Sequence, residues 1–288
     1  MATSIQEIFD PSHFLDLTST LRRGDPIGTN QIGTRAHATA SGDLPKEDTR
    51  FWVVQHGNCI VAVAMWTSLT GIYLSPTFSP SDAATLGRIV SEVAINQLPQ
   101  ASGPAASIHS FNEGYCKAQS PALTPQWKET LLVYVLKTLK SNPANGSLLQ
   151  ATDADSDLLK AWIVQFCDAL HYPVEMAEPF HRRSMERKSL HVWHVDGSIV
   201  GFVGYHPPVV HDGETIFRIG PVYVTPQERR KGYSSAMTAA LSQYLQDGCH
   251  IPSRVMLFAD AMNPASNKAY QNVGFVQHSE VGVYTFVK

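Results

Sequence analysis

A short basic segment in the second half of the chain carries residue types that bind phosphate. Arg229-Arg230-Lys231-Gly232-Tyr233-Ser234 follows an apolar strand-like run, Glu214–Thr225, and opens a run of small and apolar residues that predicts a helix over Lys231–Asp247. The first N–H groups of a helix lack intrahelical partners, and the helix dipole favours an anion there. Gly232 permits close backbone approach, and Ser235 adds a second hydroxyl. The segment predicts a phosphate cradle; the alternative is a solvated basic turn before an ordinary helix.

Known phosphate-binding patterns limit which phosphate-containing ligand this segment could bind. Neither G-x-x-x-x-G-K-[ST] nor G-x-G-x-x-G occurs, so the two common nucleotide fingerprints are absent. Arg229–Ser234 does fit R-x-x-G-x-[GA] with Ser234 in the last place. A second pattern, N-x-x-S-x-x-x-Y-x-x-x-G-F, fits Asn263–Phe275 and follows a predicted strand at Arg254–Asp260. Both patterns, in this order, resemble the GNAT superfamily of N-acetyltransferases.

The resemblance covers roughly residues 147–288 and implies a set of roles. Acetyl-CoA would be the acyl donor, with Arg229–Ser234 as its pyrophosphate loop. Backbone groups of the preceding strand would pair with the pantetheine arm and polarise the thioester carbonyl. Tyr270 would be the acid that protonates the leaving thiolate. The implied cofactor-binding residues are Val222, Tyr223, Val224, Arg229, Arg230, Lys231, Gly232, Tyr233, Ser234, Asn263 and Asn267.

The general base is not fixed by these patterns. Many members of the superfamily carry Glu in the strand before the loop, and here the corresponding residue is Arg218, which cannot accept a proton. The remaining candidates are Glu214, His206, Tyr205 and Glu178. His206 has the most suitable unperturbed pKa, but it is equally explained as a surface-loop histidine. A chain of water molecules without a dedicated base is a further alternative.

The elements that must position these residues fall into two halves. Ser141–Gly146 is the best linker candidate, so we predict domains at 1–140 and 141–288. The resemblance extends weakly over Arg50–Lys140 and implies a degenerate GNAT-like domain without a basic loop. The expected fold is α/β (α+β): a mixed, mostly antiparallel central sheet flanked by helices, with two such domains in tandem. Ile60–Met65 resembles Ile199–Gly204, which indicates either a duplicated unit or only the composition that apolar hairpins share.

The N-terminal half predicts the following elements from its pattern of apolar residues. A short helix is expected over Pro11–Arg23, a loop over Gly24–Asp48, a hairpin of Arg50–Gln55 and Cys59–Leu69, helices from Ser79 to Gln97 and over Ser110–Gln119, and a long connecting strand over Lys128–Lys140. The second half predicts strands at Leu148–Gln150, Ser189–Val195, Ser198–Tyr205 and Val281–Val287, and helices from Thr152 to His171, over Glu175–Arg187 and over Pro264–Asn272.

Composition excludes several function classes. The 288 residues carry 22 basic and 25 acidic side chains, a net charge of −3, which offers no broad basic surface for nucleic acid or anionic lipid. The four cysteines are scattered without a CxxC unit, as is usual in a reducing compartment. No basic-then-apolar leader or membrane-length apolar run occurs. We expect a cytoplasmic protein without metal, nucleic-acid or membrane partners; oligomeric state has no signal in the sequence.

The favoured hypothesis is an acetyl-CoA-dependent N-acetyltransferase acting on the amine of a small molecule. Two alternatives remain: transfer to a protein lysine or N-terminus, and a non-catalytic acyl-CoA-binding protein.

Overall fold

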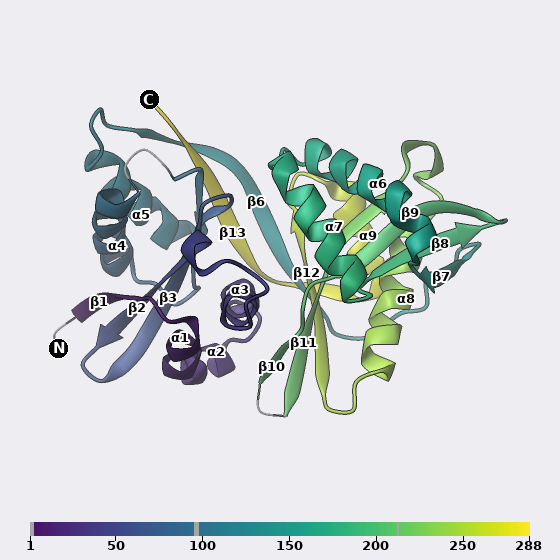
Figure 1. The fold of residues 1–288 in the computed structure, drawn as a ribbon, viewed down its shortest axis with the longest axis horizontal. Coiled ribbons are helices and arrows are strands. Elements are labelled where there is room, and N and C mark those ends of the chain that lie inside the picture. Colours follow the sequence, from purple (N-terminus) through teal and green to yellow (C-terminus); the bar gives the residue numbers. More distant parts are fainter. Residues whose placement is uncertain (1–2, 95–97, 212) are drawn as a thin grey trace. The chain divides into compact units, whose positions relative to one another are not determined.

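The computed structural model describes residues 3–94, 98–211 and 213–288, which belong to two compact units (Figure 1). Unit 1 is Met1–Leu132 with Ser279–Lys288, and unit 2 is Val133–His278. The elements that lie in or begin in unit 1 are β1 (Thr3–Ile8), α1 (Pro11–Leu17), α2 (Ser19–Gly24), α3 (Asn30–Ala40), β2 (Thr49–His56), β3 (Cys59–Thr67), β4 (Gly71–Leu74), α4 (Pro80–Val93), β5 (Gln100–Gly103), α5 (Ala105–Lys117) and β6 (Thr124–Leu136). The remaining elements are β7 (Ser147–Gln150), α6 (Ser156–Ala169), α7 (Ala177–Glu186), β8 (Leu190–Val195), β9 (Ser198–Tyr205), β10 (Val209–His211), β11 (Glu214–Val224), α8 (Tyr233–Asp247), β12 (Ser253–Asp260), α9 (Pro264–Val273) and β13 (Phe275–Val287).

The two units repeat one strand order. Unit 1 runs β1-β2-β3-β4-β5-β13, and unit 2 runs β7-β8-β9-β11-β12-β6. In each unit the pairs at the start are antiparallel, whereas β4–β5 and β11–β12 are parallel. The two hairpins that echo each other in sequence, β2–β3 and β8–β9, occupy the same place in this order. The predicted fold class, a mixed and mostly antiparallel sheet flanked by helices and present twice, is confirmed.

The last strand in the order of each unit is shared along the chain with the other unit. β6 follows α5 of unit 1, but its residues from Val133 onward belong to unit 2. β13 follows α9 of unit 2, but its residues from Ser279 onward belong to unit 1, where Gly282 pairs with Gly103. The compact units therefore part at 132/133 and 278/279, whereas the sequence analysis predicted one boundary at 140/141. A linker-like composition at Ser141–Gly146 marks a loop inside unit 2.

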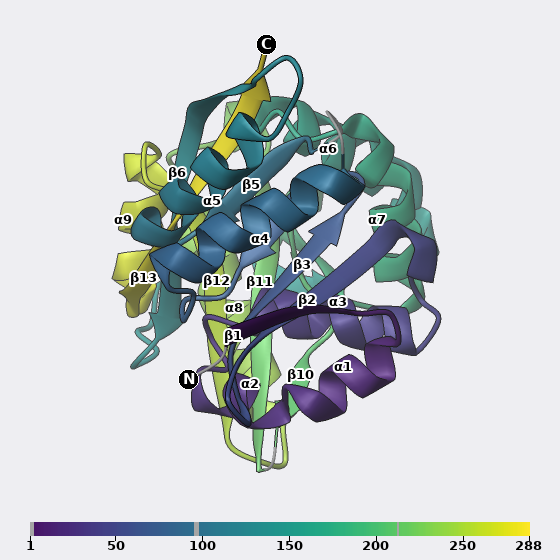
Figure 2. The ribbon, with the colours of Figure 1, turned by 90° about the vertical axis from the view of Figure 1, so that its left-hand side faces the viewer.

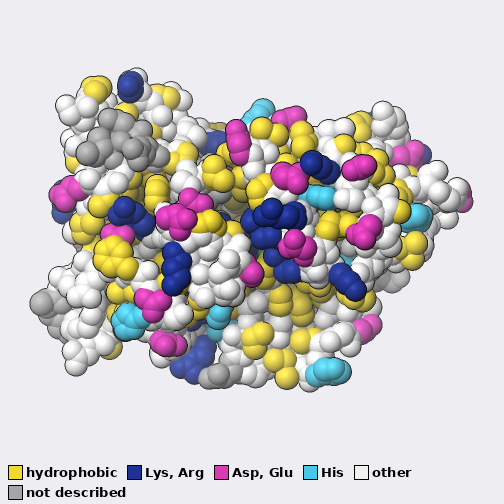
Figure 3. All heavy atoms as spheres, viewed as in Figure 1, with side chains coloured by type: hydrophobic (Ala, Val, Ile, Leu, Met, Phe, Trp, Pro, Cys, Tyr) yellow, Lys and Arg dark blue, Asp and Glu magenta, His cyan; other side chains and the backbone are white. Residues whose placement is uncertain are grey.

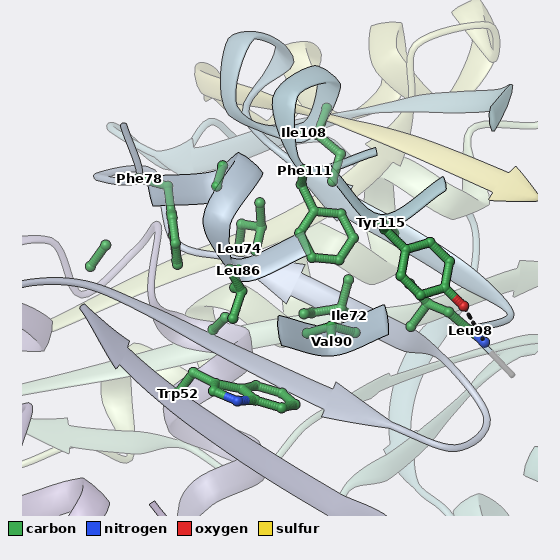
Figure 4. Close-up of a cluster of buried hydrophobic side chains, with 14 of the residues drawn as sticks. Trp52, Ile72, Leu74, Phe78, Leu86, Val90, Leu98, Ile108, Phe111 and Tyr115 are labelled. Carbon is green, nitrogen blue, oxygen red and sulfur yellow. Dashed lines mark hydrogen bonds between the residues drawn. The ribbon is translucent and has the colours of Figure 1, made fainter. Parts of the chain in front are cut away.

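The sheet of unit 1 is covered on both faces at β2 to β4, where most residues are apolar and buried. Alternate residues of β2 point to opposite sides: Phe51 stacks on Phe14 of α1 at 4.5 Å between ring centroids, whereas Trp52 joins a core beneath α4 and α5. Figure 2 shows α4 and α5 crossing this sheet side by side. Figure 4 shows the core, with Trp52 and Ile72 facing Val90, and Tyr115 accepting a hydrogen bond from the Leu98 N–H.

Unit 2 is layered in the same way. On one face, Trp162 of α6 packs against Phe202 and Tyr223, with ring centroids 6.4 and 5.7 Å apart. On the other, α8 contacts β9, β11 and β12 and buries Met237 and Leu241 completely. Burial of side chains from both faces fixes the positions of β11 and β12, between which the candidate site lies.

Most predicted elements are confirmed, including both hairpins and the long strand β6. The loop predicted over Gly24–Asp48 is wrong, because α3 occupies Asn30–Ala40. This helix buries Ile32 and Ala36 one turn apart, but small polar residues between them weaken the apolar pattern. The predicted helix over Pro11–Arg23 is two helices that meet at Thr18. The predicted end of α4 at Gln97 lies outside the described residues.

Candidate functional site

Strands β11 and β12 separate midway along their length. Their parallel register runs from Thr215–Ser253 to Ile219–Leu257, and beyond this point β11 stays paired only with β9 among the described residues. The β9–β11 register also shifts between Ile219 and Val222. A cavity of about 880 Å³ fills the gap, and its size is at the upper end of the roughly 300–1,000 Å³ typical of small-molecule sites. The walls are residues 219–224, residues 257–260, the start of α8, and α9.

The N-terminus of α8 supplies hydrogen-bond donors to this cavity. Gly232 is the N-cap residue, with φ of +86° and no side-chain cap hydrogen bond, and the first intrahelical bond recorded there runs from Ala236 N–H to the Gly232 carbonyl. The N–H groups of the first turn therefore keep their bonding capacity. Gly232, Tyr233, Ser234 and Ser235 all line the cavity. Such a terminus, with its dipole, is suited to a phosphate or pyrophosphate.

The three cations of the loop are placed differently. Arg229 and Arg230 line the cavity, and Arg229 Nε donates to the Val224 carbonyl at 3.1 Å. Lys231 is exposed and lies outside the cavity lining, where its Nζ pairs with Glu228 Oε2 at 2.9 Å. This hydrogen bond raises the Lys231 pKa. Two of the three predicted cations are thus brought to the cavity, while the third is held by a neighbouring carboxylate.

The strand wall is formed by Val222, Tyr223 and Val224. On one edge they pair with β9, Val222 opposite Val203 and Val224 opposite Gly201. An antiparallel pairing uses the N–H and C=O of alternate residues only, so the others point away from β9, toward the cavity. The Tyr223 side chain is buried elsewhere, because its hydroxyl donates to Gln165 Oε1 at 2.5 Å. This wall therefore offers backbone groups rather than side-chain chemistry.

Tyr270 projects from α9 onto the cavity wall and is only 7% exposed. Its ring lies 6.3 Å from those of both Tyr134 and Phe275. Burial raises the pKa of Tyr270 to about 12 because the phenolate would lose hydration. At neutral pH the hydroxyl is therefore protonated and can donate to a group in the cavity.

The two predicted asparagines have structural partners. Asn263 lines the cavity and caps α9, since its Oδ1 accepts from the Ser266 N–H at 3.0 Å. Asn267 is outside the cavity lining, and its Nδ2 donates to the carbonyls of Asp260 at 3.0 Å and Ala261 at 3.3 Å. Both side chains thus hold the β12–α9 turn in shape.

One wall was missed by the sequence analysis. Phe166, Ala169 and Leu170, at the end of α6, also line the cavity. The amphipathic pattern of this segment predicted a helix, but a stripe of apolar residues does not distinguish a face that packs on a sheet from one that closes a cavity.

Three of the four candidate bases are poorly suited to accept a proton, because two are in ion pairs and one keeps its hydroxyl protonated. Glu214 accepts both Nε and Nη2 of Arg254, at 2.7 and 2.5 Å. Glu178 pairs with Lys160, and this hydrogen bond lowers its pKa. Burial raises the pKa of Tyr205, which keeps its hydroxyl protonated. The fourth, His206, lies beside Gly220, which lines the cavity.

The matching helix terminus in unit 1 is closed by its own side chains. Ser79 caps α4 by accepting from the Asp82 N–H at 3.1 Å, and its hydroxyl donates to Asp82 Oδ2 at 2.6 Å. His56 Nε2 lies 3.2 Å from the same carboxylate, which is buried. A carboxylate at a helix N-terminus satisfies its dipole and repels a phosphate. Of these two matching termini, α4 and α8, that of α8 is the one left open to an anion.

The fold and this cavity define a GNAT-type architecture, and the comparisons agree. Residues 157–275, all within unit 2, match the model of the Acetyltransferase (GNAT) family. Unit 2 therefore carries a domain of this acetyltransferase family over residues 157–275. Comparison with curated protein sequences found no significant match.

Three solved structures illustrate the similarity in fold. One is a GNAT-family acetyltransferase from Colwellia psychrerythraea, 15% identical, with 100% of both chains covered and a TM-score of 0.57. Another is a tandem GNAT protein from the clavulanic acid biosynthesis pathway, 11% identical, with 99% and 98% covered and a TM-score of 0.59. The third is a glucosamine N-acetyltransferase region of a fungal multi-domain β-N-acetylglucosaminidase, 11% identical, with 98% of this chain and 38% of that one covered and a TM-score of 0.58.

The distribution of charged side chains on the surface agrees with the small net charge of the chain. On the face shown in Figure 3, the basic side chains lie singly or in a small central group with acidic side chains beside it, and they form no broad basic area. Within residues 3–94, 98–211 and 213–288, no helix combines the length and the hydropathy needed to span a membrane.

Proposed function

We propose that unit 2 binds acetyl-CoA and transfers its acetyl group to the amine of a small molecule. The observation that carries this proposal is the uncapped N-terminus of α8, which opens into the cavity between the separated strands β11 and β12. An anion-accepting end, a wall of backbone donors and acceptors, and a buried phenol on α9 all line this cavity. Acetyl-CoA has a matching part for each of them: a pyrophosphate, an amide-bearing arm and a thioester.

The binding step uses the backbone more than side chains. The N–H groups of Gly232–Ser235, with Arg229 and Arg230, hold the pyrophosphate. The free edge of Val222–Val224 pairs with the amides of the arm, and an N–H of this strand polarises the thioester carbonyl. Arg229 must then release the Val224 carbonyl, which its Nε occupies in the structure.

The chemical step requires a proton for the departing thiolate. Tyr270 holds one at neutral pH. The burial that raises the pKa of Tyr270 also disfavours a free thiolate in the same cavity. The proton affinities of the Tyr270 phenolate and of the leaving thiolate therefore rise together. Acetyl-CoA supplies the activated acyl group; the protein supplies position, exclusion of water and this proton.

The acceptor class is supported by one fold relative, the fungal region described as a glucosamine N-acetyltransferase, whose acceptor is a small amine. A panel of small primary amines, amino sugars and lysine peptides, with detection of the released thiol, tests this directly. Turnover with small amines and none with peptides is expected. Turnover with peptides alone would assign the chain to protein acetylation. Binding of acetyl-CoA without turnover of any acceptor would leave only an acyl-CoA-binding protein.

A further inference from the structure

His206 lies beside the irregular part of β11. It follows the end of β9, and its backbone N–H donates to the Arg218 carbonyl at 2.9 Å. The ring sits against Gly220: a Cβ built on this glycine would lie 3.8 Å from His206 Nε2. Gly220 itself lines the cavity and has φ of +152°. His206 thus lies beside the point where β11 leaves β12, next to a glycine that lines the cavity, while its own side chain is not part of the lining.

The surroundings of this ring keep it neutral. Burial lowers the pKa of His206 well below its ordinary value, and the charges of Arg218 and Arg187 lower it further. Phe180 of α7 covers the ring at 6.0 Å between centroids. The groups facing His206 are therefore an aromatic ring from α7, a guanidinium from β11 and a second from the residue after α7, with no carboxylate among these contacts. A neutral imidazole has a free lone pair for a proton.

We propose that His206 is the general base that deprotonates the acceptor amine. This inference rests on the proposed function. In the step, Nε2 of His206 takes one proton from the acceptor ammonium, and the freed nitrogen lone pair forms a bond to the thioester carbonyl carbon. The C–S bond then breaks, and the thiolate takes the proton of Tyr270. The attacking nitrogen loses its second proton to the Tyr270 phenolate, and His206 returns its proton to solvent, so one proton is released per turnover.

A base of low pKa is weak, but the positive charges of Arg218 and Arg187 that lower the pKa of His206 also act on the acceptor amine. Cations near an ammonium lower the ammonium pKa just as they lower that of His206. The charges of Arg218 and Arg187 therefore need not widen the difference between the two pKa values that the proton must cross. The other candidates do not compete, since Glu214 and Glu178 are in ion pairs.

The test compares two nucleophiles with acetyl-CoA in wild type and His206→Gln. One is the fastest primary alkylamine from the amine panel, which is an ammonium at pH 7 and needs a base. The other is hydroxylamine, which is already mostly neutral at that pH. Loss of a general base should slow the alkylamine by about 100-fold or more, while hydroxylamine slows by less than about tenfold. His191→Gln, which changes a buried histidine of unit 2 that packs against the rings of Tyr205 and Tyr244, is the matched control and should leave both rates unchanged.

Equal losses for the two nucleophiles, or no loss for either, would overturn the assignment. A wild-type pH profile of kcat/KM decides the case if His206→Gln does not fold. If His206 is the base, kcat/KM should increase with pH in the range below pH 6.5, as the imidazole loses its proton. It should then stay constant until the free amine itself loses its proton. A rate that rises only at the pKa of the free amine would overturn it. Turnover of the alkylamine by the wild type, together with thermal stabilisation of the variant by acetyl-CoA, shows that the proposed function stands even where this inference fails.

Discussion

Replacing Tyr270 by Phe removes one hydroxyl from the cavity wall and leaves the ring contacts with Tyr134 and Phe275 in place. With a pKa of about 12, roughly one Tyr270 in 10⁴ is ionised at pH 8, so nearly every molecule holds the proton that the thiolate needs. Loss of a general acid typically costs about 10²- to 10⁴-fold in rate. We therefore expect kcat to fall at least about 100-fold in Tyr270→Phe.

The assay is steady-state release of free thiol with the best amine of the panel, alongside thermal shift with acetyl-CoA. The thermal shift should stay unchanged, because the hydroxyl acts on the leaving group rather than on the bound pyrophosphate. Tyr134→Phe is the matched control: its ring is the neighbour of Tyr270, its hydroxyl contacts Gln271, and it is not part of the cavity lining. A kcat for Tyr270→Phe within about threefold of wild type would refute the role of this residue as acid.

Two further predictions follow from the loop and from the core. Gly232→Glu should abolish the thermal shift by acetyl-CoA, because a carboxylate would stand at the N-terminus of α8. Gly197→Glu is the control: it lies at a turn with φ of +83° and equally open space, so it adds the same charge and backbone strain but should keep the shift. Equal loss of the shift in both variants would contradict the phosphate cradle. Burial lowers the pKa of His191 to about 4, so its unfolded form binds a proton below pH 6.5 while the folded form does not. Unfolding at pH 4.5 should therefore be easier by about 2 to 3 kcal/mol from this residue alone, and His191→Phe should remove that part of the pH dependence in urea titrations; a pH dependence unchanged from wild type would contradict it.

Local patterns predicted unit 2 well because its elements carry strong signals. The Asp196-Gly197 turn marks the β8–β9 hairpin, Pro264 and Gly274 bracket α9, and the basic loop marks the start of α8. The site residues grouped around the cavity are those whose types are demanded by phosphate and proton chemistry. Lys231 and Asn267 fit the same patterns, but the patterns do not record that neighbouring groups already engage them.

The rest depends on contacts distant in sequence. Strands β4 and β5 have only four residues each, too few for a period to emerge, and they form because both are buried between longer strands and helices. The sequences of β6 and β13 do not show that each strand runs from one unit into the other. The pairing of a strand depends on the strands beside it as well as on its own residues. Likewise, the closure of the α4 terminus by Asp82 and His56 joins residues 26 positions apart.

Calorimetric titration with acetyl-CoA tests the central claim most directly. The account predicts saturable binding of one molecule per chain, because unit 2 has an open helix terminus and unit 1 has one closed by Asp82. Gly232→Glu should eliminate this binding, and Asp82→Asn should leave it intact. An absence of binding by the wild type, a stoichiometry of two, or binding that survives Gly232→Glu would contradict the account.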